Sequence, residues 1–137
     1  MTLLIGEQPS AGGDPAAPLE GAIGKRLAEY AGLTLDEYLT RTERRNLIEY
    51  ASATWPASQA SLNAGMLWSS LIGRRTIMLG QRVAKSFGIQ WQPLRWVTVD
   101  DRGTQVAILP HPSGKNLWWN EPENRAAARR FLTETFR

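Results

Sequence analysis

The chain has 137 residues, enough for one compact domain with a buried core and too few for two independent domains. Its composition is close to the globular average, with 42% hydrophobic and 21% charged residues, so a disordered chain is excluded. Sixteen Lys and Arg residues against 13 Asp and Glu residues give a net charge of +3, which permits a polyanionic partner without requiring one.

The absence of cysteine limits the chemistry that the chain can perform. Disulfides, a thiolate nucleophile, iron–sulfur clusters and cysteine-ligated zinc sites are all excluded. The sequence holds one histidine, His111, which also excludes a metal site built from several histidines. We therefore expect no metal and no cofactor.

The first ten residues, MTLLIGEQPS, carry no basic segment, and their apolar run stops after three residues. This pattern predicts neither a signal peptide nor a membrane anchor. We expect a cytoplasmic protein with no membrane partner.

Three short apolar runs stand out along the chain. Continuous runs without alternation are typical of strands buried on both faces, as in a parallel sheet covered by helices. The runs are Leu3–Ile5, Thr76–Leu79 and Val106–Leu109.

The segment 19–31 has helical spacing. Its apolar residues recur every three or four positions, which predicts a helix with one apolar face. Lys25, Arg26 and Glu29 lie elsewhere on the helical wheel.

Two further helices are predicted from their spacing and their ends. One covers 58–72, with Ser58 as its N-cap and Gly73 after its last turn. The other runs to the end of the chain and starts at a capping box formed by Asn120 and Glu123.

Strands that alternate with helices predict the α/β class. We expect a three-layer α/β/α sandwich with a central, mainly parallel four-stranded sheet. No repeat or linker divides the chain, so residues 1–137 should form a single domain.

Polar and glycine-rich segments follow each predicted strand. They begin at Gly6, Gly80 and Pro110. The carboxyl ends of parallel strands form the ligand crevice of an open α/β sheet, so these segments should converge on one site.

Motifs in this order resemble those of the uracil-DNA glycosylase superfamily. GEQPS at 6–10, a glycine-rich stretch with Asp14 and PLEG at 18–21 are similar to the branch with the signature GEAPG, an acidic residue and RPFVG. RTIMLGQRVAKSFG at 75–88 resembles the central strand and helix of the superfamily, and HPS at 111–113 matches its second motif. The resemblance covers nearly the whole chain and implies a uracil-DNA-glycosylase-like domain.

The sequence departs from that branch at two points. The branch holds an iron–sulfur cluster with four cysteines, and this chain has none, so the resemblance implies a member without the cluster. Leu19 stands where the family commonly has a phenylalanine that stacks on the flipped base, and it offers apolar contact without an aromatic face.

Two residues fit the chemistry of N-glycosidic bond cleavage. The reaction passes through an oxocarbenium-like sugar and a departing base anion, so it needs a carboxylate near C1′ and a donor near the base. Glu7 would stabilise the sugar cation, and His111 would donate a hydrogen bond to the leaving base. The resemblance implies that Gln8, Leu19 and Asn46 bind the base.

DNA would be the partner, either single- or double-stranded, and the base must be flipped out of its stack. Relatives push an apolar side chain into the vacated space, so Leu117 or Trp118 is the predicted wedge. The expected contacts to the DNA backbone are Ser10, Gly12, Gly13, Ser113, Gly114 and Lys115.

Several of these residues also have a structural explanation. Glu7 could be a solvated turn residue, and His111 a histidine bonded to a backbone carbonyl. Asn46 could equally be a turn or cap residue. We expect Trp118 and Trp119 mainly to pack the last helix against the sheet.

The sequence leaves two functions open. The first is a monofunctional, monomeric DNA base glycosylase that acts on uracil or another modified base without a cofactor. The alternative is an inactive or repurposed member of the superfamily that binds DNA or a nucleotide through the same crevice.

Overall fold

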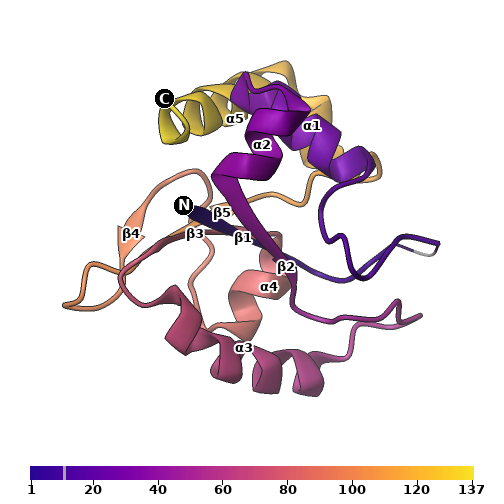
Figure 1. Ribbon diagram of the computed structural model, residues 1–137, viewed down its shortest axis with the longest axis vertical. Helices are drawn as coiled ribbons and strands as arrows, with labels where there is room; N and C mark the ends of the chain where they lie inside the picture. The colour runs from indigo at the N-terminus through magenta and orange to yellow at the C-terminus, as the bar shows by residue number, and fades with distance from the viewer. Residues whose placement is uncertain (11) are drawn as a thin grey trace.

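A computed structural model describes residues 1–10 and 12–137 of the chain (Figure 1). These residues form a five-stranded sheet with the order β2-β1-β3-β5-β4. The first four strands in that order are parallel, and β4 pairs antiparallel with β5. The strands are β1 (Thr2–Gly6), β2 (Thr42–Asn46), β3 (Arg75–Leu79), β4 (Val97–Thr98) and β5 (Gln105–Leu109).

Helices cover both faces of this sheet (Figure 1). Helix α1 packs against α2 and α5 on one face, and α3 packs against α4 on the other. The helices are α1 (Ala22–Ala31), α2 (Leu35–Arg41), α3 (Ala57–Leu71), α4 (Gln81–Ser86) and α5 (Pro122–Thr135), with a short 3₁₀ helix η1 (Leu117–Asn120) before the last. The predicted three-layer α/β/α sandwich with a mainly parallel sheet is confirmed.

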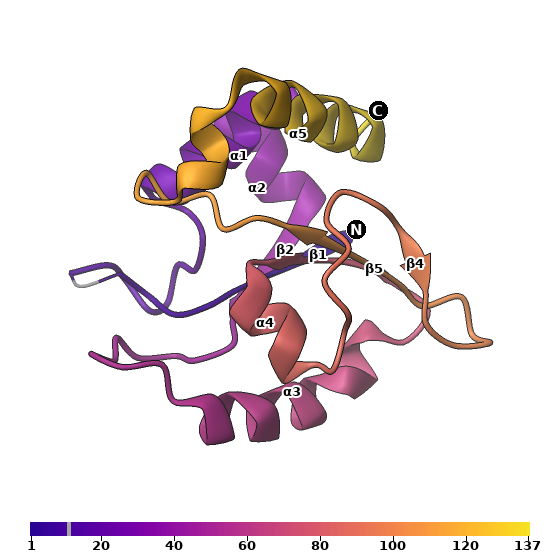
Figure 2. The same ribbon diagram turned by 180° about the vertical axis from the view of Figure 1, so that it is seen from behind.

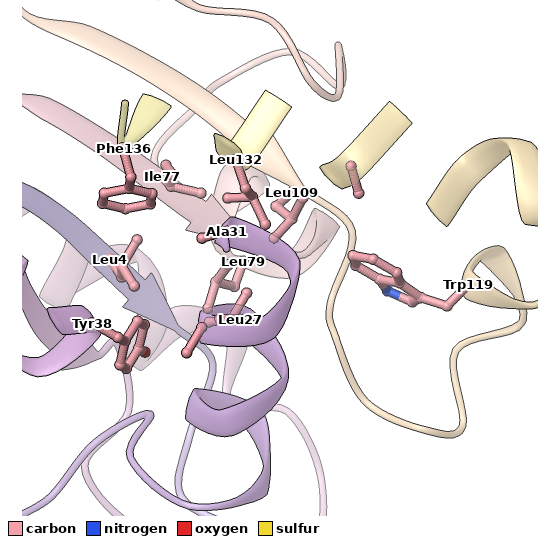
Figure 3. Close-up of a cluster of buried hydrophobic side chains, with 12 residues drawn as sticks. Leu4, Leu27, Ala31, Tyr38, Ile77, Leu79, Leu109, Trp119, Leu132 and Phe136 are labelled. Atoms are coloured by element: carbon pink, nitrogen blue, oxygen red, sulfur yellow. The ribbon is translucent and has the colours of Figure 1, made fainter. Parts of the chain in front are cut away.

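Buried side chains form one cluster on each side of the sheet. Leu4 on β1 faces α1, α2 and α5, whereas its neighbours Leu3 and Ile5 face α3 and α4. This alternation follows from the two-residue period of a strand. Figure 3 shows the first cluster, which Trp119 joins from the segment after β5.

The sheet has five strands in the described part of the chain, and the prediction of four was wrong. The missed strand β2, TERRN, lies at an edge, pairs only with β1 and is only partly buried. The missed strand β4 has two residues. Neither carries the continuous apolar run that marks a strand buried on both faces.

The helix ends differ from those predicted. Helix α1 starts at Ala22, after its N-cap Gly21, and Leu19, where the predicted helix began, has a positive φ of 59°. Pro56, not Ser58, stands at the N-cap of α3. Glu121 takes that place before α5, whereas the predicted cap Asn120 belongs to η1.

No helix in the described residues is long and apolar enough to cross a membrane.

Candidate active site

Three neighbouring parallel strands, β1, β3 and β5, bring the predicted site segments to one edge of the sheet. Glu7 and Gly80 directly follow β1 and β3, and His111 follows β5 after one proline. These residues line a hollow of about 300 Å³. Its remaining walls come from Pro110 and from Gln81, Arg82, Trp91, Asn116 and Trp118.

Glu7 and His111 both lie against Gly80. A Cβ placed on Gly80 would be 3.2 Å from Glu7 Oε2 and 3.3 Å from His111 Cβ. Gly80 also has φ 103° and ψ 161°, a conformation open essentially to glycine alone. A residue without a side chain therefore allows the carboxylate and the histidine to approach the same point.

The surroundings of His111 favour the neutral imidazole. Burial lowers the pKa of His111, the nearby Glu7 carboxylate acts in the opposite direction, and the Arg82 guanidinium lowers it further. Since the ordinary value is 6.5, a lowered pKa leaves the ring uncharged at neutral pH. An uncharged imidazole still carries one N–H donor.

Two side chains fix the main chain at His111. Its carbonyl oxygen accepts hydrogen bonds from Trp119 Nε1 at 2.8 Å and from Asn116 Nδ2 at 3.0 Å. Within residues 1–10 and 12–137, the His111 ring itself donates to no backbone carbonyl. The alternative explanation of His111 needs a hydrogen bond from its ring to a backbone carbonyl, and this bond is absent within those ranges. The ring is therefore left available to a ligand.

A second cavity, of about 400 Å³, shares no described lining residue with the first, but some of its lining residues are next to those of the first in the sequence. Glu7 and His111 line the first cavity, and the residues next to them in sequence, Gln8 and Pro112, line the second. Most of the expected base-binding and DNA-binding residues meet here. They are Gln8, Ser10, Gly13, Leu19, Asn46, Ser113 and Gly114.

Two residues that line this second cavity, Gln8 and Asn46, each carry a buried amide oxygen without a hydrogen-bond partner among the described residues. Asn46 Oδ1 and Gln8 Oε1 are buried and accept no hydrogen bond from the described residues. The Gln8 amide is fixed at its other end, because Nε2 donates to the Ser52 carbonyl at 3.0 Å. A buried acceptor without a partner is costly, so both oxygens suit a ligand that brings N–H groups.

Leu19 closes the cavity over Gly6. A Cβ on Gly6 would be 2.7 Å from Leu19 Cδ2 and 2.8 Å from Asn46 Oδ1, so both side chains converge on this glycine. Leu19 holds a positive φ of 59°, which is rare for a branched side chain. Its apolar side chain lines the second cavity.

Sequence reasoning missed Arg26. The helical wheel separates it from the apolar face of α1, yet the side chain is partly buried and lines the second cavity. Its Nη1 donates to the Pro112 carbonyl at 2.8 Å. Arg26 thus ties α1 to the loop that carries His111, and a single sequence holds no signal for a contact between such distant segments.

The two wedge candidates differ in exposure. Leu117 is 75% exposed, whereas Trp118 is half-buried and packs edge-on against Trp119 with ring centroids 4.8 Å apart. Trp119 is buried, as expected for packing against the sheet. Of the two candidates, Leu117 is the more exposed side chain.

Some of the residues expected to contact the DNA backbone already form hydrogen bonds within the protein. The Gly13 N–H donates to the Ser10 carbonyl at 2.8 Å, so this amide is not free to bind a phosphate. The Ser113 hydroxyl accepts from the Lys115 N–H at 3.3 Å. Gly12, Gly114 and the Lys115 side chain are exposed, although Gly12 and Lys115 line neither cavity.

No group of three His, Asp or Glu side chains able to hold a metal ion occurs in the part of the chain that the structure describes. The candidate site combines Glu7 and His111 in the first cavity with Gln8 and Asn46 in the second, whose walls also include Asp14 and Glu20. No family model and no curated protein matches the chain.

Proposed function

We propose that the chain is a DNA base glycosylase, which hydrolyses the N-glycosidic bond of uracil or another modified base after that base has been flipped out of DNA. The observation that carries the proposal is the approach of Glu7 and His111 to the same glycine, Gly80. The resemblance of these motifs to the uracil-DNA glycosylase superfamily supports the same assignment.

The roles of the two residues follow from the charges that the reaction develops. Water adds to C1′ while the bond from C1′ to the base nitrogen breaks, and its electron pair leaves with the base. The Glu7 carboxylate stabilises the positive sugar and orients the water, which releases one of its protons to solvent as the new C1′–O bond forms. The neutral His111 ring donates a hydrogen bond to the departing base anion, which then takes up a proton from solvent.

The second cavity supports the choice of substrate. Asn46 Oδ1 lacks a donor among the described residues, and a base of the uracil type offers one ring N–H beside its carbonyl groups. The Leu19 side chain supplies an apolar wall for the ring. The site is built within one chain, so we propose a monomeric enzyme. We also propose DNA as its partner and a cytoplasmic location.

The test is base release from synthetic DNA. Oligonucleotides that contain uracil, 5-hydroxymethyluracil, hypoxanthine or xanthine are incubated with the protein, and abasic sites are then cleaved with alkali. Glu7→Gln should lower the turnover by about 10²- to 10³-fold with little change in DNA affinity, because the carboxylate acts on transition-state charge. Glu134→Gln, an exposed carboxylate on α5, is the matched control and should keep full activity.

The alternative of a non-catalytic DNA or nucleotide binder gives a different result. Wild-type protein would then bind DNA with a steep salt dependence and release none of the four bases. Lys115→Ala should lower the salt slope on duplex DNA by about one unit in either case, since it removes a phosphate contact. The turnover of wild-type protein and of Glu7→Gln therefore decides between the two functions.

A further inference from the structure

The segment that runs from α4 to β4 combines positive charge with tryptophan. Residues 81–96, QRVAKSFGIQWQPLRW, hold three cations, two tryptophans and no carboxylate. Figure 2 shows the coil after α4 rising past the sheet to β4. The proposed glycosylase chemistry gives none of these side chains a direct contact with the reacting atoms.

Trp91 lies between two hollows. It is 40% exposed and lines the hollow that contains Glu7 and His111. It also lines another hollow, of about 310 Å³, beside α4, and Gln81 borders both hollows as well. The indole is therefore a wall that leads from the candidate active site onto the surface of α4.

The two cations of α4 are distributed along this path. Arg82 lines the hollow with His111, and Lys85 lines the hollow on the far side of Trp91. Both are exposed, and neither forms an ion pair within the residues that the structure describes. An exposed aromatic ring between unpaired cations is the arrangement that binds a single nucleic-acid strand, with a base on the ring and phosphates beside the cations.

We infer that Trp91, Arg82 and Lys85 form a track for an unpaired stretch of DNA next to the flipped nucleotide, with one base stacked on Trp91. The inference rests on the proposed function, because that function brings DNA to the hollow of Glu7 and His111. A base can stack on Trp91 only when it has left its own stack. The track therefore favours single-stranded over double-stranded DNA.

The test is binding of fluorescein-labelled oligothymidine, followed by anisotropy at one fixed salt concentration. Trp91→Ala should weaken binding by roughly 5- to 150-fold, the range for loss of one base–aromatic stack. Trp91→Phe should bind nearly as the wild type does, because it keeps a ring. Leu62→Ala, which removes a side chain that is 64% exposed on α3, is the control and should leave affinity unchanged.

Two further measurements separate stacking on Trp91 from a general loss of structure. Trp91→Ala should lose much less affinity for a duplex of the same length and should unfold at the same urea concentration as Trp91→Phe. Lys85→Ala should lower the salt slope on oligothymidine by about 0.7 units, the contribution of one phosphate contact on a single strand.

Equal losses on single and double strands, an unchanged affinity of Trp91→Ala, or no wild-type binding to oligothymidine at low salt would each overturn the inference. Base release is measured separately from this binding. If Trp91→Ala has the expected effects but the wild-type protein releases no base, the single-strand track is supported and the glycosylase function is rejected.

Discussion

The phenolic hydroxyl of Tyr38 donates a hydrogen bond to the main-chain carbonyl oxygen of Leu19 at 2.8 Å. Tyr38 is a buried residue of α2, and burial raises its pKa, so the hydroxyl remains a donor at every physiological pH. Leu19 needs such support, because its positive φ of 59° is unfavourable for leucine. A core residue thus holds in place the side chain that closes the candidate base cavity.

Tyr38→Phe should lower the free energy of unfolding by about 1 kcal/mol, the net value of one hydrogen bond. Urea denaturation measures this change. Tyr30→Phe is the matched control, because the ring of Tyr30 packs on Trp119 and its hydroxyl donates to none of the described residues. Equal effects of the two substitutions would show that the bond to Leu19 contributes nothing.

Gly80→Ala should destabilise the protein and disturb the site together. The new Cβ would crowd Glu7 Oε2 and His111 Cβ, and the positive φ of 103° adds a cost of about 1–3 kcal/mol. Gly103→Ala is the control, since Gly103 also has a positive φ, of 80°, but nothing within 4 Å of its Cβ position. Both variants should unfold at lower urea concentration, and only Gly80→Ala should shift the His111 ring resonances in an NMR spectrum.

The elements that the sequence predicts well are those whose environment is uniform. Strands β1, β3 and β5 are buried on both faces, so their apolar runs suffice to predict them. Edge strand β2 is polar, and the Nη1 group of its Arg44 donates to the carbonyls of Leu39 and Thr42. Hydropathy alone cannot predict such a strand.

Helix α2 was missed although a local signal exists. Thr34 accepts from the Glu37 N–H, and Glu37 in turn accepts from the Thr34 N–H, which is a complete capping box. The helix has only seven residues, and of these only Tyr38 is buried, so its apolar periodicity is weak.

Some features of the candidate site could also be predicted from the sequence, and others could not. The placement of Glu7 and His111 at one edge follows from strand order, because loops after parallel strands meet there. The bond from Arg26 to Pro112 and the strained backbone of Leu19 depend on tertiary packing. Apolar periodicity predicts only which face of a helix packs against the protein core, not which distant segment a side chain contacts.

The free energy of unfolding should fall as the pH drops below 6.5, the ordinary pKa of the histidine. Burial lowers the pKa of His111 in the folded protein, so the unfolded chain binds more protons in this range. The contribution of the neutral His111 ring to the free energy of unfolding is fully present above pH 6.5. It is lost as the pH falls through the lower pKa that His111 has in the folded protein. Urea denaturation at pH values of about 5.5 and 7.5 measures the difference.

His111→Gln should reduce that pH dependence, since the chain has no other histidine. NMR titration of His111 gives a second check. Glu7→Gln should lower the His111 pKa further, and Arg82→Gln should raise it, because these are the charges that act on the ring. A His111 pKa above 6.5 in wild-type protein would show that the Glu7 carboxylate outweighs the effect of burial and would contradict this prediction.

Arg26→Ala should loosen the loop that carries His111. The substitution removes a hydrogen bond from a charged donor to the Pro112 carbonyl, worth about 1.5–3 kcal/mol. We expect a lower urea midpoint, a His111 pKa closer to 6.5 and reduced base release. Lys25→Ala, at the neighbouring exposed position of α1, is the control, and matching behaviour of the two variants would rule out a role for the Arg26 contact.

Leu117→Ala should impair base release from duplex DNA more than from single strands. Flipping a base out of a duplex costs a few kcal/mol of unstacking at each step, and an inserted side chain recovers part of that cost. Leu117 is 75% exposed beside the candidate site, so it can enter the vacated space without rearrangement of the core.

The expected loss on a duplex substrate is about tenfold or more, with little change on the same sequence as a single strand. The measured quantity is the ratio of kcat/KM for the two substrates. Leu62→Ala removes an equally apolar and similarly exposed side chain from α3, so it controls for general surface effects. A loss of the same size on both substrates would mean that Leu117 contacts DNA without acting as a wedge.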